Sequence, residues 1–241
     1  MSEDQTLAST ARVRELLALG YGHVNSDDQA PALGYFDRAL EQVSPLDDAR
    51  LEAEVQNARG IALLYQRNNT AALAAFEVSL ARARASGVEY LEADACHNVG
   101  VTLQRIGRHA AALTALERAV DLFERQDAPS ALPITWHTVA RCHAALGRRN
   151  DALAAYDRTV DSAVRLENDR ELARAAFGRA LLLRRSRQRS DAEASLEVAI
   201  AAHTRLGAMR STRRLRLRLA LWRLQRGRVG GALAALISRG G

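Results

Sequence analysis

The sequence repeats itself with a period of 40 residues, and this period limits the possible folds more than any other feature does. Alanine recurs at that spacing six times, at Ala32, Ala72, Ala112, Ala152, Ala192 and Ala232. A second small residue stands twelve residues before each alanine, and these are Gly20, Gly60, Gly100, Ala140, Ala180 and Ala220. Periods of this length are typical of solenoids, in which copies of one supersecondary unit are stacked. The chain is therefore predicted to contain about six copies of one unit.

Each copy has the pattern of two helices joined by a turn. Four residues after each alanine comes a larger side chain, at Phe36, Phe76, Leu116, Tyr156, Leu196 and Leu236. Helix breakers follow the same period, with Leu146-Gly147 inside a copy and Ser86-Gly87 between copies. Thr70, Asn150 and Ser190 are expected to be N-caps of second helices. With no alternating strand pattern of useful length, the sequence predicts an all-α fold of about twelve helices.

This pattern resembles the tetratricopeptide repeat, in which a Trp-x2-Leu-Gly-x2-Tyr helix precedes a helix carrying Ala-x3-Phe-x2-Ala. Gly20, Ala32, Phe36 and Ala39 give the best match, and Trp136 falls on the family's Trp position. In the family the small residue lies where the two helices of a repeat cross, because a larger side chain would separate their backbones. The large residue is expected to fill the space toward the next repeat.

The resemblance implies a right-handed superhelical solenoid that forms a single domain over residues 1–241. Its expected repeats, the last truncated and basic, cover about residues 12–47, 48–87, 88–127, 128–167, 168–207 and 208–241. The family's usual period is 34 residues, so this chain resembles the longer-period members found among bacterial regulators and kinesin light chains. The six additional residues per copy are expected to lengthen the helices or the links.

In the resembled family the first helices of the repeats line a concave, peptide-binding groove. Counting from the small residue of each copy gives the candidate groove residues Tyr21, Asn57, Tyr65, His97, Gln104, Arg105, His137, Arg141, Arg174, Arg184 and Arg185. The same count also places on this wall the apolar residues Leu17, Ile61, Leu64, Val101, Phe177, Leu181, Leu217 and Leu221. Arginine forks hold carboxylates bidentately, which favours an acidic peptide as the ligand. Alternatively, these arginines pair with acids of neighbouring helices or stay hydrated.

Charge is distributed unevenly along the chain. Residues 1–169 carry a net charge of −7 and residues 170–241 carry +13, and all 34 basic residues are arginine. The most basic segment is expected to be a terminal helix that contains Arg213, Arg214, Arg216, Arg218 and Trp222. This helix is interpreted as a cap of the solenoid. The alternatives are contact with nucleic acid, a membrane surface or a second protein.

The sequence predicts a non-enzymatic scaffold or adaptor that binds a protein or peptide partner, and the arginines favour an acidic one. No catalytic motif is present, and the absence of lysine excludes a phosphate-binding loop and Schiff-base chemistry. Neither a cofactor nor a metal site is expected, because Cys96 and Cys142 have no paired spacing. No membrane span is predicted, and an acidic N-terminus favours a cytoplasmic location. The alternative functions are nucleic-acid binding by the basic C-terminal repeats and self-association into a homo-oligomer.

Overall fold

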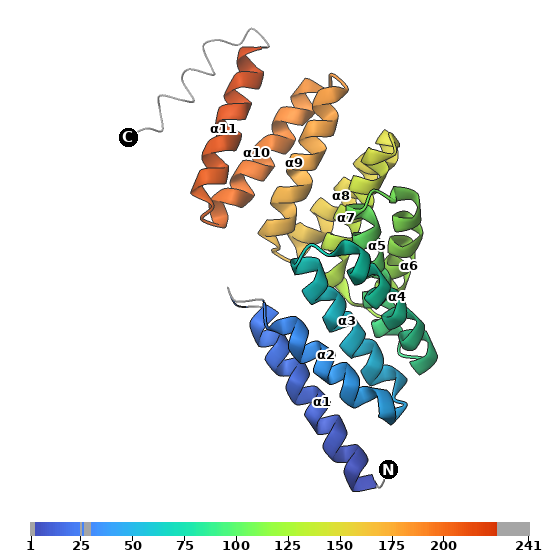
Figure 1. Cartoon of the computed structure of the whole chain (residues 1–241). Coiled ribbons are helices and arrows are strands. Elements are labelled where there is room, and N and C mark those ends of the chain that lie inside the picture. Colours follow the sequence, from blue (N-terminus) through green and yellow to red (C-terminus); the bar gives the residue numbers. More distant parts are fainter. Residues whose placement is uncertain (1–2, 25, 27–29, 226–241) are drawn as a thin grey trace. The chain divides into compact units, whose positions relative to one another are not determined.

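The computed structural model describes residues 3–24, 26 and 30–225 (Figure 1). This part of the chain contains eleven α-helices, two short 3-10 helices and no strand, so the all-α fold class is confirmed. The elements in chain order are α1 (Glu3–Val24), α2 (Ala32–Val43), η1 (Ser44–Leu46), α3 (Ala49–Tyr65), α4 (Asn69–Ser86), α5 (Glu89–Arg105), α6 (His109–Arg125), η2 (Pro129–Ala131), α7 (Leu132–Ala145), α8 (Arg149–Arg165), α9 (Asp169–Arg185), α10 (Arg189–Arg205) and α11 (Met209–Leu224). The expected second helix of the sixth repeat, with Ala232 and Leu236, lies outside the described residues.

The helices form two compact units, which we call the N-terminal unit (residues 1–128) and the C-terminal unit (residues 129–241). Within each unit, the two helices of one repeat pack against each other, as α3 does with α4 and α9 with α10. First helices of consecutive repeats also touch, since α3 contacts both α1 and α5, and α7 contacts α9. Each unit therefore presents a row of neighbouring first helices. That all six repeats form one continuous domain stays a prediction.

A residue with a positive φ angle recurs every 20 residues, between consecutive helices. These residues are Asp47, Arg67, Gly87, Gly107, Asp127, Gly147, Glu167, Arg187 and Gly207. At most of them the next N–H bonds to the carbonyl five residues earlier, as in Asn68 N–H to Leu63 O at 2.9 Å. This bond closes the end of a helix in the Schellman manner. Because most helices from α3 to α10 have 17 residues, the additional residues of the long period lie in the helices and not in the links.

The same turns decide where the second helices begin. In α4 the cap is Asn68, whose side chain accepts a hydrogen bond from the N–H of Ala71 at 3.2 Å. The prediction of Thr70 as a cap was wrong, and so were those of Asn150 and Ser190, because α8 and α10 are capped at Arg148 and Gln188. A helix starts as soon as the chain leaves the left-handed residue, which places the cap directly after that residue.

In the first three repeats the small residue, Gly20, Gly60 or Gly100, lies where the two helices of that repeat cross, as predicted. A Cβ atom added to Gly20 would lie 2.3 Å from the ring of Phe36, and one added to Gly60 would lie 2.5 Å from Phe76. Both rings are completely buried. Because Gly20 and Gly60 have no side chain, α1 and α2, and likewise α3 and α4, can approach closely.

The large residue at the crossing also contacts the following repeat. Phe36 belongs to a core cluster that includes Leu51 and Val55 of α3. Tyr156 of α8 similarly reaches α9, where a Cβ on Gly178 would lie 2.5 Å from the tyrosine hydroxyl. In these two repeats one buried side chain therefore contacts both its own helix pair and the following repeat, which is the role predicted from the sequence.

Candidate functional site

Each unit has a first-helix face, which we define as the side chains that its first helices carry at the predicted groove positions. In the N-terminal unit this face belongs to α1, α3 and α5, and in the C-terminal unit to α7, α9 and α11. All eleven candidate groove residues lie on these helices and are half-buried or exposed. Tyr65, Arg105, Arg141, Arg174 and Arg185 are the exposed members of that set. One peptide site that runs across both units stays a prediction.

The face of the N-terminal unit is polar and partly acidic. Asn57 of α3 accepts a hydrogen bond at 2.8 Å from the side-chain amide of Asn98 on α5, which joins two neighbouring first helices. Tyr21 packs edge-on against Phe36 with ring centroids 5.5 Å apart. Burial, together with the negative charges of Glu54 and Asp94, raises the pKa of Tyr21 to about 12. The phenol therefore stays neutral in every physiological condition.

Asp94 and Glu54 were not among the predicted groove residues, although they occupy equivalent positions one period apart. Burial raises the pKa of Asp94 above its ordinary value, because a carboxylate loses hydration there. Glu54 is half-buried and forms an ion pair with Arg50, at 3.2 Å on the preceding turn of α3. The sequence signal for both was the 40-residue spacing from Glu54 to Asp94.

In the C-terminal unit a buried carboxylate joins the first helices. Glu171 of α9 has a side chain only 5% exposed, and one of its oxygens lies 3.0 Å from Nδ1 of His137 on α7. The other oxygen accepts a hydrogen bond from Arg174 at 2.7 Å. Burial disfavours the charged form of Glu171, but the hydrogen bond from His137 and the charge of Arg174 outweigh burial and lower its pKa. Two predicted groove residues are thus brought together by a glutamate that the sequence analysis missed.

A spacing in the sequence could have pointed to Glu171. It stands three residues before Arg174, and acidic and basic side chains three residues apart meet on a helix surface. The bond to His137 of another helix carries no such local signal. Arg174 is therefore partly committed to a structural contact, which the alternative interpretation of the arginines had anticipated.

The other arginines predicted for the groove of this unit differ in their contacts. Arg184 stacks over Trp222 at 5.3 Å and hydrogen-bonds to Gln225, so it links α9 to α11. Arg141 and Arg185 are exposed, and neither forms an ion pair within the part of the chain that the structure describes. The guanidinium groups of these two side chains therefore remain available for an external carboxylate.

The terminal basic helix expected from the sequence is α11. Among its 16 residues are six arginines and no acid. Arg213, Arg214, Arg216 and Arg218 are exposed, while Trp222 is half-buried beneath Arg184. Arg210, Arg213, Arg214 and Leu217 line an open hollow of about 250 Å³ on this helix.

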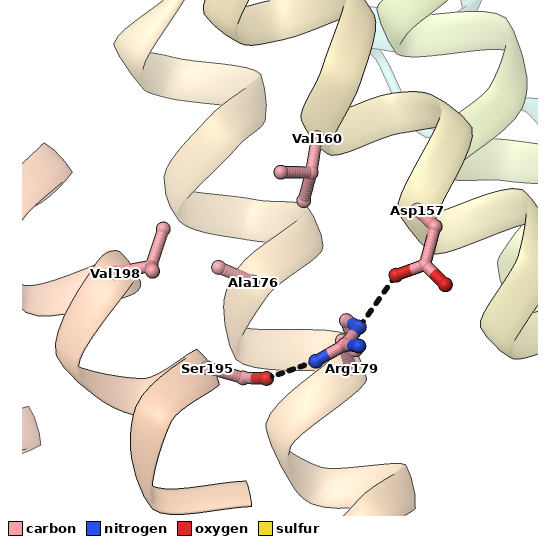
Figure 2. Close-up of a pocket in the computed structure, with 6 residues that line it drawn as sticks. All are labelled: Asp157, Val160, Ala176, Arg179, Ser195 and Val198. Carbon is pink, nitrogen blue, oxygen red and sulfur yellow. Dashed lines mark hydrogen bonds and ion pairs between the residues drawn. The ribbon is translucent and has the colours of Figure 1, made fainter. Parts of the chain in front are cut away.

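A second hollow, of about 170 Å³, lies among α8, α9 and α10 (Figure 2). Figure 2 shows Arg179 reaching Asp157 in one direction and Ser195 in the other, with distances of 2.6 and 2.5 Å. The remaining lining is the small apolar groups of Val160, Ala176 and Val198. Arg59 and Asp37 form the same ion pair, at 2.7 Å, between α2 and α3. This repeated pair ties consecutive repeats together, and its cation is already neutralised.

The described residues offer little for other kinds of site. They contain no group of three His, Cys, Asp or Glu side chains arranged to hold a metal ion. Cys96 and Cys142 are buried, and burial raises the pKa of each thiol to about 11, which keeps both protonated and unreactive. None of the described helices is long and apolar enough to cross a membrane.

Comparison with known structures places this fold among helical-repeat proteins. RapI in its apo form matches 93% of this chain and 80% of its own length, with 18% identity and a TM-score of 0.73. A Rap protein complexed with competence and sporulation factor matches 90% of this chain with 19% identity and a TM-score of 0.64. This chain covers 64% of that Rap protein.

A third structure carries the repeat in its description. YrrB, a TPR protein with an unusual peptide-binding site, matches 78% of this chain and 85% of its own length, with 21% identity and a TM-score of 0.55. No curated protein shows significant sequence similarity to the chain. Residues 93–125, which span α5 and α6, match the tetratricopeptide repeat family. This match shows a repeat of the tetratricopeptide type at residues 93–125, and the solved structures share the helical-repeat fold over most of the chain.

Proposed function

We propose that this protein is a non-enzymatic interaction module that holds a peptide segment of a partner protein on its first-helix face. The observation that carries the proposal is the set of exposed arginines without ion pairs on the C-terminal unit, among them Arg141, Arg185 and Arg214. The similar Rap protein and YrrB are described as binding a factor and a peptide, which supports a role of this kind.

An acidic segment is the ligand that this face favours. Several arginines elsewhere in the chain are neutralised, for example Arg118 by Glu92 and Arg205 by Asp169. Those that remain unpaired on α7, α9 and α11 would each gain a carboxylate at low cost, because they are already hydrated and exposed. Several such contacts along a row of helices add to a useful affinity and are weakened by salt.

The test compares two triple variants with the same loss of charge. The first removes three arginines of the face (Arg141→Ala, Arg185→Ala and Arg214→Ala), and the control removes three exposed arginines elsewhere (Arg108→Ala, Arg148→Ala and Arg165→Ala). Binding of a fluorescently labelled, glutamate-rich peptide to the full chain is measured by anisotropy. We expect at least about tenfold weaker binding for the face variant, about 1.4 kcal/mol, and a much smaller effect for the control. Equal losses of affinity in the two variants would show that only net charge matters, and would refute the proposal that the peptide binds to the first-helix face.

Nucleic-acid binding by α11 is the second candidate, because this helix has six arginines and no acid. Against it, the ring of Trp222 is covered by Arg184 and does not offer a free stacking surface. Adding single-stranded DNA as a competitor in the same anisotropy assay separates the candidates. Tighter binding of DNA than of the acidic peptide, with a steep dependence on salt, would favour this second function.

A further inference from the structure

The first-helix face of the C-terminal unit carries exposed leucines between its arginines. On α11, Leu217, Leu221 and Leu224 are 52%, 50% and 36% exposed. Their spacing of four and three residues places them on one side of the helix. Leu181 of α9 occupies the position equivalent to Leu221 one period earlier and is 36% exposed. A row of large apolar side chains is thus left in contact with water along two neighbouring first helices.

Arginines flank this apolar row on the same side of α11. Arg214 and Arg218 stand three residues before Leu217 and Leu221, respectively, and both are exposed. The hollow lined by Arg210, Arg213, Arg214 and Leu217 adjoins the row at the start of the helix. Guanidinium groups and leucine side chains therefore alternate within one strip of surface. We call it the Leu/Arg strip, and it consists of Leu181 of α9 and of Arg214, Leu217, Arg218, Leu221 and Leu224 of α11.

Contacts between α9 and α11 hold the strip in place. The guanidinium of Arg218 lies 5.2 Å from the ring of Phe177, and that of Arg184 lies 5.3 Å from the ring of Trp222. The two aromatic side chains are thereby half-buried, whereas the leucines of the strip keep their exposure. A ligand would find the strip already formed and would lose little entropy in ordering it.

We propose that the Leu/Arg strip of α9 and α11 binds an acidic amphipathic helix of a partner protein. The inference rests on the proposed function and adds to it the shape and apolar character of the ligand. A purely acidic, extended segment would leave the leucines in water, and a purely apolar one would strip water from the arginines without compensation. An amphipathic helix with leucines at positions i, i+4 and i+7 and carboxylates beside them satisfies both groups.

Three labelled peptides test the strip against the full chain. The first is an acidic amphipathic peptide with leucines on one helical side, the second has the same composition in an order that scatters the leucines, and the third has glutamate in place of leucine. We expect the amphipathic peptide to bind at least about tenfold tighter than the other two, which is about 1.4 kcal/mol. Equal affinity for the first two peptides would overturn the inference.

Two matched substitutions locate the contact. Leu221→Ser removes an anchor of the strip, and Leu19→Ser removes a leucine of similar exposure, 43%, from α1 in the other unit. Leu221→Ser should weaken binding of the amphipathic peptide about fivefold or more, which is about 1 kcal/mol, and should leave the glutamate-only peptide unchanged. Leu19→Ser should change neither. An unchanged affinity in Leu221→Ser and also in Leu217→Ser would overturn the strip.

The outcomes also separate this inference from the function on which it rests. If all three peptides bind equally and the arginine triple variant abolishes binding, the proposed binding of an acidic peptide is supported and the proposed role of the Leu/Arg strip is refuted. If none of the peptides binds, both the proposed function and the proposed role of the strip are refuted. Vesicles containing phosphatidylserine form the last arm. Binding to them that Leu221→Ser weakens, without binding of the amphipathic peptide, would assign the strip to a membrane surface and overturn the proposal.

Discussion

The two units share one architecture but differ in what their first helices present. On the first helices of the N-terminal unit, the predicted groove residue Asn57 is accompanied by Glu54 and Asp94, which were not predicted, whereas the predicted positions of the C-terminal unit include arginines and leucines. The half-buried carboxylate of Asp94 and the buried one of Glu171 differ as well, since the pKa of Asp94 is raised and that of Glu171 is lowered. The repeat fixes the helix packing, whereas the exposed positions of each copy are free to carry different chemistry. A scaffold of this kind can hold two different ligand surfaces on the same backbone plan.

The helix crossings show the same contrast inside the core. The N-terminal unit uses glycine at its crossings, with Gly60 directly beneath the buried ring of Phe76. The C-terminal unit uses alanine, including Ala180, which is completely buried. The close approach under a phenylalanine leaves no room for Cβ, while the crossings of the C-terminal unit already accommodate one.

The largest expected effect is at a glycine crossing, where the packed core leaves no space for a Cβ atom. Gly60→Ala should destabilise the protein by about 2 kcal/mol, because its Cβ would lie 2.5 Å from a ring that cannot move in a packed core. Urea unfolding followed by circular dichroism measures the change. The control is Gly34→Ala on α2, where an added Cβ meets no atom, and this change should stabilise the protein by about 0.5–1 kcal/mol. Equal effects of the two substitutions would contradict the crossing.

A smaller effect is expected at the carboxylate of the C-terminal unit. Glu171→Gln should cost about 2 kcal/mol or less at neutral pH, since the bonds from His137 and Arg174 lose their charged acceptor. The folded-state pKa of Glu171 is lowered, so its contribution is present above the ordinary glutamate pKa and is lost as pH falls through the lowered value. Urea unfolding at a series of pH values should show the difference vanish in acid.

Glu117→Gln serves as the control for that series. Glu117 is exposed and forms no ion pair within the described residues, so this variant should match the parent protein at every pH. A deficit in Glu171→Gln that persisted unchanged to low pH would point to lost packing and not to lost charge.

The smallest effect, with the opposite sign, is expected at Asp94 in the N-terminal unit. Asp94→Asn should stabilise the protein at neutral pH by less than about 1 kcal/mol, because a half-buried charge is removed. Since the folded-state pKa of Asp94 is raised, the parent protein loses stability as pH rises from the ordinary aspartate pKa through the raised one. Asp94→Asn should lack that loss in the same urea series. A destabilised variant would mean that the carboxylate has a favourable partner, and the contrast with Glu171 would then disappear.

Local features of the sequence were sufficient to predict much of this protein. The 40-residue period, the helix pairs, the breaks such as Ser86-Gly87 and the small residues at the crossings all depend on short-range patterns and on packing between adjacent helices. The N-caps were predicted two residues too late, because the left-handed residue of each turn sets the start of the next helix. At Arg67 and Arg187 that residue is not a glycine, so the sequence gives no sign of it.

The repeat architecture follows from local sequence patterns, because neighbouring residues specify a helix and its turns and the same pattern recurs in every copy. The chemistry of the surface depends instead on the tertiary structure. Whether an arginine is neutralised, as Arg179 is by Asp157, or remains available, as Arg185 does, depends on side chains from other helices. The same holds for the burial of Glu171 and the exposure of Leu221. These properties arise from contacts between residues far apart in the chain, which the periodic pattern does not encode.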